Sequence, residues 1–234
     1  MTDIIREIAF DTETTGLEWD KDDRVIELGA VELINHVPTG NTFQTYINPG
    51  RPVSQDTIRI TGITDDDLRD KPGFEDASIV DAFLDFIGDA TLVAHNASFD
   101  RGFLNMELKR CGKAIIPEDR WVDTVMIARK KFPGAPANLD ALCRRFDVNL
   151  EARTYHGALL DSQLLAEVYL ELLGGRARAF DFGGAQSNSG TLNRTQAATR
   201  PSPRSASIPD TEKATHAAFV ETLGEDAIWT KYTS

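Results

Sequence analysis

The stretch that decides the fold lies near the N-terminus and reads Ile4-Ile5-Arg6-Glu7-Ile8-Ala9-Phe10-Asp11-Thr12-Glu13-Thr14-Thr15-Gly16. Residues 4–10 are mostly apolar, which is typical of a strand that is buried on at least one face. Side chains alternate along a strand, so we expect Asp11 and Glu13 to point to one side of it and Thr12 to point to the other.

Two carboxylates that share one side of a strand repel each other. At ~4 Å and an effective dielectric constant of ~20, the repulsion is about 4 kcal/mol. A fold that holds Asp11 and Glu13 together at the end of a buried strand therefore favours a bound cation. The alternative is an ordinary acidic loop after the strand, and only partner residues elsewhere in the chain distinguish the two.

Length and composition limit the class of protein. The chain has 234 residues, enough for one sizeable domain and an appendage, and 41% of them are hydrophobic. Cys111 and Cys143 are the only cysteines, and their spacing indicates neither a disulfide framework nor a zinc site. Because the sequence shows no signal pattern and no apolar run near the ~18 residues of a membrane span, we expect a cytoplasmic protein.

The charge is unevenly distributed. The net charge of −12 arises from −13 in residues 1–175, +3 in residues 176–210 and −2 in residues 211–234. Affinity for nucleic acid comes mainly from Lys and Arg, so the acidic first segment is a poor independent DNA binder. An enzyme that grips only a strand end, or that receives its DNA from a partner, remains compatible with this charge.

Apolar patterning along the chain predicts an α/β fold. After the first strand, residues 24–34 and 41–48 predict two further strands, with Pro38-Thr39-Gly40 between them, which indicates an antiparallel meander. A short buried strand is expected at residues 91–95. Helices are predicted at residues 54–60, 64–69, 78–87, 97–111, 123–131, 138–146 and 157–173. Strands first, then strands alternating with helices, give a mixed sheet.

Three regions follow from this pattern. Residues 1–175 hold every long periodic segment and form the predicted domain. Residues 176–210 are dominated by Gly, Ser, Thr, Asn, Arg and Pro, which predicts a flexible linker. In residues 211–234 a short apolar helical face reappears, followed by aromatic residues, which indicates an anchor for another protein. The candidate anchor residues are Phe219, Leu223, Ile228 and Trp229.

Further polar groups stand where helices begin. Asp100 falls in the first turn of the helix after the strand at 91–95, and His156 stands just before the last helix of the domain. Asp161 lies on the apolar side of that last helix, where a carboxylate is costly unless it is paired or bound to metal. The alternatives are an N-terminal charge favoured by the helix dipole for Asp161 and a loop histidine for His156.

Together these motifs resemble one known family. Asp-Thr-Glu-Thr-Thr-Gly at 11–16, His-Asn-Ala-Ser-Phe-Asp at 95–100 and His-Gly-Ala-Leu-Leu-Asp at 156–161 are similar, in order and spacing, to the DEDDh 3′–5′ exonucleases. Residues 153–170 closely resemble the proofreading subunits of bacterial replicative DNA polymerases. The likeness covers residues 5–175 and reappears at residues 223–229, which resemble the end of such subunits that binds the polymerase catalytic (alpha) subunit.

The resemblance implies a fold and a set of roles. The fold is RNase H-like, a mixed five-stranded sheet with flanking helices. Asp11, Glu13 and Asp161 would hold one Mg²⁺ or Mn²⁺, and Asp11 would bridge to a second ion that Asp100 steadies. His156 would take the proton from the attacking water, because an imidazole can exchange a proton near neutral pH. The product would be a 5′-nucleoside monophosphate released from a DNA 3′ end.

The resemblance also implies contacts to substrate and partners. Thr14, Thr15, Gly16 and Leu17 would lie against the terminal nucleotide, with Leu17 beside its base, and Asn96 and Phe99 would lie nearby. Thr61 occupies a position where many members of the family carry His. Many members also have a glutamine-led peptide for the sliding clamp just after the nuclease domain. Residues 174–182 lack that glutamine, and Phe180 and Phe182 are the candidate clamp anchors here.

Two other functions remain as alternatives. A free-standing DEDDh nuclease in RNA maturation or DNA repair would need its own basic or aromatic binding surface, and it would leave the linker and the aromatic tail without a purpose. A non-catalytic adaptor that retained the fold would not need all five catalytic residue types. We therefore expect the proofreading exonuclease of a replicative polymerase.

Overall fold

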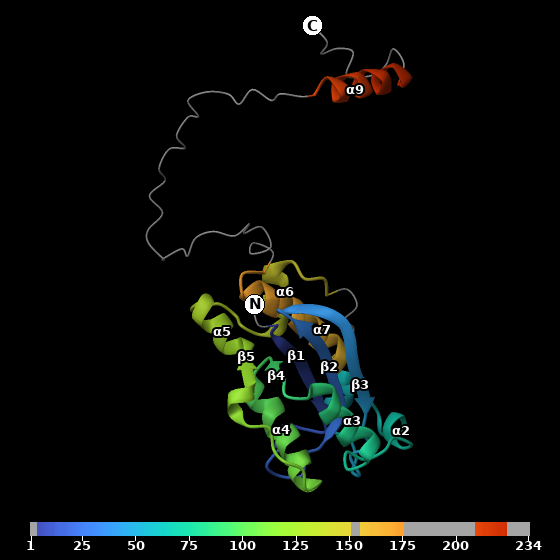
Figure 1. Cartoon of the computed structure of the whole chain (residues 1–234). Coiled ribbons are helices and arrows are strands. Elements are labelled where there is room, and N and C mark those ends of the chain that lie inside the picture. The colour runs from blue at the N-terminus through green and yellow to red at the C-terminus, as the bar shows by residue number, and fades with distance from the viewer. Residues whose placement is uncertain (1–3, 151–154, 176–208, 224–234) are drawn as a thin grey trace. The chain divides into compact units, whose positions relative to one another are not determined.

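A single five-stranded sheet forms the centre of the first unit of the chain (Figure 1). The computed structural model describes residues 4–150, 155–175 and 209–223. The strand order is β3-β2-β1-β4-β5, with bounds β1 Arg6–Thr14, β2 Val25–Ile34, β3 Val37–Tyr46, β4 Thr91–Ala94 and β5 Trp121–Asp123. β1 pairs antiparallel with β2 and parallel with β4, so the predicted mixed sheet is confirmed.

The predicted meander is also confirmed, but its second turn lies elsewhere. β2 pairs antiparallel with β3, and β3 already begins at Val37. The turn consists of Asn35 and His36, both with positive φ (50° and 69°), as expected for a two-residue hairpin. Placing the break at Pro38-Thr39-Gly40 was therefore wrong. Asn35 accepts a hydrogen bond from the Ile5 amide, and this tertiary contact fixes the turn where composition alone favoured Pro and Gly.

The helices fall close to their predicted positions. They are α1 Gln55–Thr61, α2 Asp65–Leu68, α3 Ala77–Ile87, α4 Ala97–Arg110, α5 Thr124–Lys131, α6 Leu139–Phe146 and α7 Ala158–Leu172, with a 3-10 turn at Glu118–Arg120. Ser54, Asp76 and Asn138 cap the helices that follow them, and these caps explain where the helices begin. The sequence patterns did not locate β5, because three partly buried residues are too few to show a period.

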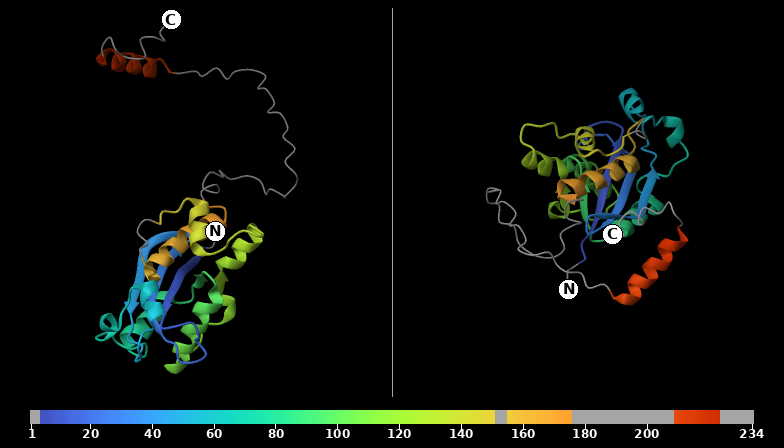
Figure 2. Two further views of the ribbon diagram at one scale, coloured as in Figure 1. Left: turned by 180° about the vertical axis from the view of Figure 1, so that it is seen from behind. Right: turned by 90° about the horizontal axis from the view of Figure 1, so that it is seen from above.

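Helices cover both faces of the sheet (Figure 2). On one face Ile8 and Phe10 of β1 pack with Phe83 of α3 and Phe103 of α4. On the other face the intervening Ala9 packs with the apolar side of α7 and with α5 and α6. Alternate side chains of β1 thus pack into the hydrophobic cores on the two faces of the sheet. The same alternation directs Asp11 and Glu13 toward the face covered by α7.

The N-terminus of α7 lies directly on β2 at Gly29. A Cβ atom added to Gly29 would come within 2.0 Å of the Ala158 carbonyl carbon. The buried Ser162 hydroxyl donates to the Gly29 carbonyl oxygen at 2.9 Å. A side chain at position 29 would therefore push α7 away from the sheet.

The second unit spans Ala185–Ser234, and α9 (Asp210–Thr222) is its described element. The helix expected near Phe219 is present, and the side chains of Phe219 and Leu223 are 58% and 48% exposed. Ile228, Trp229, Phe180, Phe182 and most of the predicted linker lie outside the described residues. Within the described parts of the chain, no helix is long and apolar enough to cross a membrane.

We predict that Gly29→Ala lowers the free energy of unfolding by about 2 kcal/mol or more, as for other overpacked sites. The added methyl overlaps the backbone of α7, which cannot move without dragging Asp161. Urea unfolding of the two proteins gives the difference. Gly157→Ala is the control, because a Cβ there meets its nearest neighbour only at 3.9 Å. An unchanged unfolding midpoint for Gly29→Ala would show that α7 can be displaced freely.

Candidate active site

Four acidic side chains from three elements meet at the end of β1 that leads into the Thr14-Thr15-Gly16 turn. Asp11 and Glu13 come from β1, Asp100 from the first turn of α4 and Asp161 from the first turn of α7. Asp100 and Asp161 are buried, with 2% and 4% of their surface exposed. The structure therefore brings together all four carboxylates that the sequence motifs singled out.

Burial and mutual repulsion raise the pKa of Asp11 well above its ordinary value, with Asp100, Glu13 and Asp161 as the main charged neighbours. Burial also raises the pKa of Asp100 to about 7, although a hydrogen bond from Thr12 opposes the shift. Charged carboxylates are unfavourable here unless a cation accompanies them. The donor set of hard oxygen atoms fits Mg²⁺ or Mn²⁺.

Thr12 has a function that the sequence patterns did not indicate. Its side chain points away from Asp11 and Glu13, as expected, and its hydroxyl donates to Asp100 Oδ1 at 2.9 Å. Asp100 approaches β1 from the α4 side, whereas Asp161 approaches from the α7 side. Thr12 thus holds the Asp100 carboxylate, which lies on the face of the sheet opposite to α7. The position of Thr12 between Asp11 and Glu13 was the only feature of the sequence that could have indicated this role.

His156 lies beside the acidic cluster. Its Nδ1 is 3.2 Å from Asp161 Oδ2, and its backbone N–H donates to the Ile60 carbonyl oxygen of α1 at 3.1 Å. Ligand atoms of Glu13, His156 and Asp161 all lie within 4.8 Å of one another. Half of the His156 side chain is exposed, so the imidazole is accessible to water and substrate.

A cavity of about 420 Å³ opens onto this cluster. Its lining comprises the predicted Asp11, His156 and Asp161 together with His95, Asn138, Leu139, Asp140 and Arg144. Sequence reasoning did not select Asn138 or Arg144. Asn138 resembles an ordinary helix cap, and it does accept a hydrogen bond from the Ala141 amide. Arg144 resembles a surface residue of α6, yet it brings a positive charge to an acidic cavity.

A second cavity, of about 410 Å³, contains most of the residues expected at the substrate. Thr14, Gly16, Leu17, Thr61 and Phe99 line it, together with Thr12, Glu13, Ser54, Asp56, Thr57, Arg59 and Ile60. Leu17 is 79% exposed, which leaves its side chain available to a ligand. The Thr61 hydroxyl donates to the Thr57 carbonyl oxygen and accepts from the Ile63 amide.

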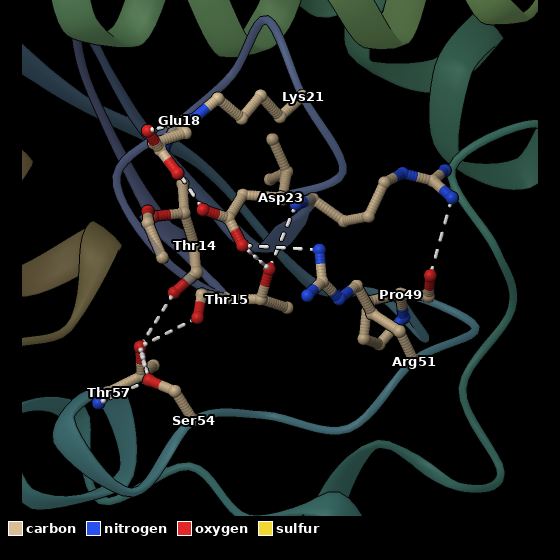
Figure 3. Close-up of polar contacts among 12 residues, drawn as sticks. Thr14, Thr15, Glu18, Lys21, Asp23, Pro49, Arg51, Ser54 and Thr57 are labelled. Atoms are coloured by element: carbon tan, nitrogen blue, oxygen red, sulfur yellow. Dashed lines mark hydrogen bonds and ion pairs between the residues drawn. The ribbon is translucent and has the colours of Figure 1, made fainter.

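The turn that carries Leu17 is held by a polar network (Figure 3). The Thr15 hydroxyl does not line this cavity. It donates a hydrogen bond to Asp23 and accepts one from the Arg24 amide. Asp23 also pairs with Arg51 at 3.2 Å. A Cβ on Gly16 would come within 2.3 Å of Asp23 Oδ2, so a side chain there would displace the Asp23 carboxylate from this network. Thr15 and Gly16 therefore shape the turn.

Asn96 lies on a different side of α4. It has a left-handed backbone conformation (φ 70°) at the start of the helix, and it lines a separate cavity with His95, Ser98 and Asp123. Its backbone N–H donates to Asp123 Oδ1 at 3.3 Å. Asn96 therefore lines a different cavity from Leu17 and Phe99, with which the sequence grouped it, although the Phe99 backbone N–H donates to the Asn96 carbonyl oxygen at 2.9 Å.

Comparison with known proteins identifies the family. Residues 8–169 match the exonuclease family RNase_T. DNA polymerase III subunit epsilon of Rickettsia felis is 50% identical over 179 residues, which cover 75% of this chain and 77% of that protein. The same subunit of Salmonella typhimurium is 46% identical over 182 residues, covering 75% and 74%. The chain belongs to the DNA polymerase III subunit epsilon family.

A solved structure of exonuclease X, in complex with 5′ overhanging duplex DNA, has the same fold. Its TM-score is 0.56 at 28% identity, and the match covers 73% of this chain and 91% of that one. Membership of the epsilon family makes the chain a 3′–5′ exonuclease with a proofreading role. Exonucleases of this DEDDh type use divalent metal ions. The expected fold and activity are therefore confirmed.

We predict that Asp11→Asn abolishes exonuclease activity and raises the melting temperature in the presence of a chelator. The substitution removes the carboxylate that the other three repel most strongly, so it relieves strain when no cation is bound. Thermal melting in EDTA and the rate on single-stranded DNA in Mg²⁺ measure both effects on the same samples. Asp85→Asn, on α3 and remote from the cluster, is the control. Activity within a few-fold of the parent would refute the assignment of Asp11.

Proposed function

We propose that the chain hydrolyses the 3′-terminal phosphodiester bond of single-stranded or frayed DNA with two bound ions, Mg²⁺ or Mn²⁺. Asp11, Glu13, Asp100 and Asp161 are the proposed ligands, and His156 is the proposed general base. The observation that carries this proposal is the convergence of three carboxylates, those of Glu13, Asp100 and Asp161, on the half-buried Asp11. Such a cluster is unfavourable without cations and well suited to them.

The surroundings of the proposed ligands hold two of them in place before substrate binds. Bound divalent cations would supply positive charge that polarises the phosphate and stabilises both the attacking and the leaving oxygen. Asp100 is held by Thr12 and Asp161 by the start of α7, so these two carboxylates stay in place without substrate. Pre-organised ligands lose little entropy when substrate binds.

His156 is suited to accept the proton of the attacking water. It borders the cavity next to Asp161, and its ring is accessible from solvent. The 3.2 Å separation between His156 Nδ1 and Asp161 Oδ2 keeps the imidazole beside the ligands. The proton then leaves through the exposed side of the ring, and the product is a 5′-nucleoside monophosphate.

The two cavities suit the two parts of a terminal nucleotide. Leu17 and Phe99 provide apolar surface for a base in the cavity that also contains Glu13. Arg144, in the cavity with Asp11, provides a cation for a phosphate. Each cavity borders part of the acidic cluster, one at Asp11 and Asp161 and the other at Glu13, so a nucleotide bound in either would place its phosphate near the proposed ligands.

We further propose that the polymerase catalytic (alpha) subunit binds the C-terminal tail and delivers the primer end. The net charge of −12 gives the chain little affinity of its own for DNA. The sequence predicts about 35 linker residues, which would span roughly 30–35 Å on average and keep the local concentration near the millimolar range. Phe219 on α9 and Leu223, the C-cap residue of that helix, offer exposed apolar side chains for such a partner.

We predict that His156→Ala slows hydrolysis by about 10²- to 10⁴-fold, the usual contribution of a general base. Binding of Mn²⁺ in the absence of DNA should stay close to that of the parent, because the four carboxylates remain. Single-turnover rates and electron paramagnetic resonance of free Mn²⁺ provide the two readouts. His216→Ala, on α9, is the control. If His156→Ala weakened Mn²⁺ binding as strongly as Asp161→Asn does, His156 would be a ligand instead of the base.

We predict that a chain ending at Gly175 digests single-stranded 3′ ends at the parent rate but no longer co-purifies with the polymerase catalytic subunit. Trp229→Ala and Phe219→Ala should weaken co-purification in the full chain, because buried aromatic residues dominate small interfaces. Lys213→Ala, on the same helix as Phe219, is the matched control. A truncated chain that bound the polymerase as tightly as the full chain would refute the tail as the anchor.

A further inference from the structure

The helix that carries Asp161 has no cap of its own. The residue at the N-cap position of α7 is Gly157, which has no side chain to accept from the first backbone N–H groups. Those groups must find partners, because a helix end leaves them unsatisfied. The partner also determines where α7 begins, and hence where Asp161 and the preceding His156 lie.

Glu27 of β2 supplies the missing cap across the fold. Its Oε2 accepts a hydrogen bond from the Ala158 backbone N–H at 3.0 Å, and its Oε1 accepts one from Gln44 Nε2 at 2.7 Å. Glu27 is 1% exposed, and a buried carboxylate is costly unless it is hydrogen-bonded. Its negative charge also faces the positive end of the helix dipole.

The register of the sheet places this cap next to the proposed metal ligands. Glu27 stands opposite Glu13 across the β1–β2 ladder, and Gly29 stands opposite Asp11. α7 is held at both positions, by the Glu27 carboxylate at Ala158 and by the bond from Ser162 to the Gly29 carbonyl oxygen. At the Asp161 end of α7, contacts with β2 therefore help to set the distance to Asp11 and Glu13, while farther along the helix the Tyr169 hydroxyl donates to Glu7 of β1.

We propose that Glu27 is the positioning residue that holds α7, and with it Asp161, at the correct distance from the ligands on β1. Glu27 acts through the reach of its side chain to the Ala158 N–H, and it is not itself a ligand. Both of its oxygen atoms are engaged by hydrogen-bond donors. This inference rests on the proposed role of Asp161 as a metal ligand.

Two conservative variants separate the effect of the length of the Glu27 side chain from the effect of its negative charge. Glu27→Gln loses the charge but keeps an oxygen that can accept from Ala158, whereas Glu27→Asp keeps the charge but is too short to reach it. Mn²⁺ affinity, measured without DNA by electron paramagnetic resonance, and the exonuclease rate are the readouts. Glu27→Asp is expected to lose about ten-fold or more in both, as for other residues that orient metal ligands, and Glu27→Gln to stay within about three-fold of the parent.

Two further variants make the result unambiguous. Glu32→Asp shortens another carboxylate of β2, one that pairs with Arg6, and it should change neither readout. Asp161→Asn tests the underlying assignment: parent-like Mn²⁺ affinity there would refute the ligand role of Asp161, whatever Glu27 does. If Asp161→Asn loses affinity, two outcomes overturn the positioning role of Glu27. One is that Glu27→Asp behaves as the parent, and the other is that Glu27→Gln loses as much as Glu27→Asp.

Discussion

The mutual repulsion of the carboxylates around Asp11 is the constraint that the rest of the structure must withstand. Asp11 is half-buried, and its pKa is raised first by the loss of hydration and then by the charges of Asp100, Glu13 and Asp161. Left to relax, such groups would move apart or take up protons. The exonuclease requires them close together, so the surrounding contacts have to hold each carboxylate in place before any cation binds.

The two helices that carry acids of the cluster, α4 with Asp100 and α7 with Asp161, each make more than one contact that fixes them against the sheet. α4 is held near its start by the bond from Thr12 to Asp100. Two turns later, Arg24 of the segment before β2 donates to both oxygens of the buried Glu107. α7 is held by Glu27, by Ser162 and by its close approach to Gly29. These contacts cross the sheet from both faces, which makes the separation of Asp100 and Asp161 a property of the sheet itself.

The acidic cluster also explains how the activity suits a subunit of a larger enzyme. A domain with an excess of acids has little affinity for the phosphate backbone, apart from cations such as Arg144 at the cavity. A nuclease that waits for a delivered primer end spares paired DNA. Low intrinsic affinity for DNA agrees with the proposed attachment to the polymerase, for which Phe219 on α9 and its C-cap residue Leu223 offer exposed apolar surface.

The sequence alone determined the alternation of β1, the acids at helix starts and the family, because these depend on local periodicity and on short motifs. It also placed the helices of residues 1–175 within one or two residues, whereas α9 begins seven residues before the helical face expected at 217–223. Only the tertiary structure placed the hairpin turn at Asn35 and His36, located β5 and revealed the bond from Thr12 to Asp100. The cap that Glu27 provides to α7 joins residues 131 positions apart. No local pattern encodes such a pair, since the register of β2 against β1 and the absence of a side chain at Gly29 bring it together.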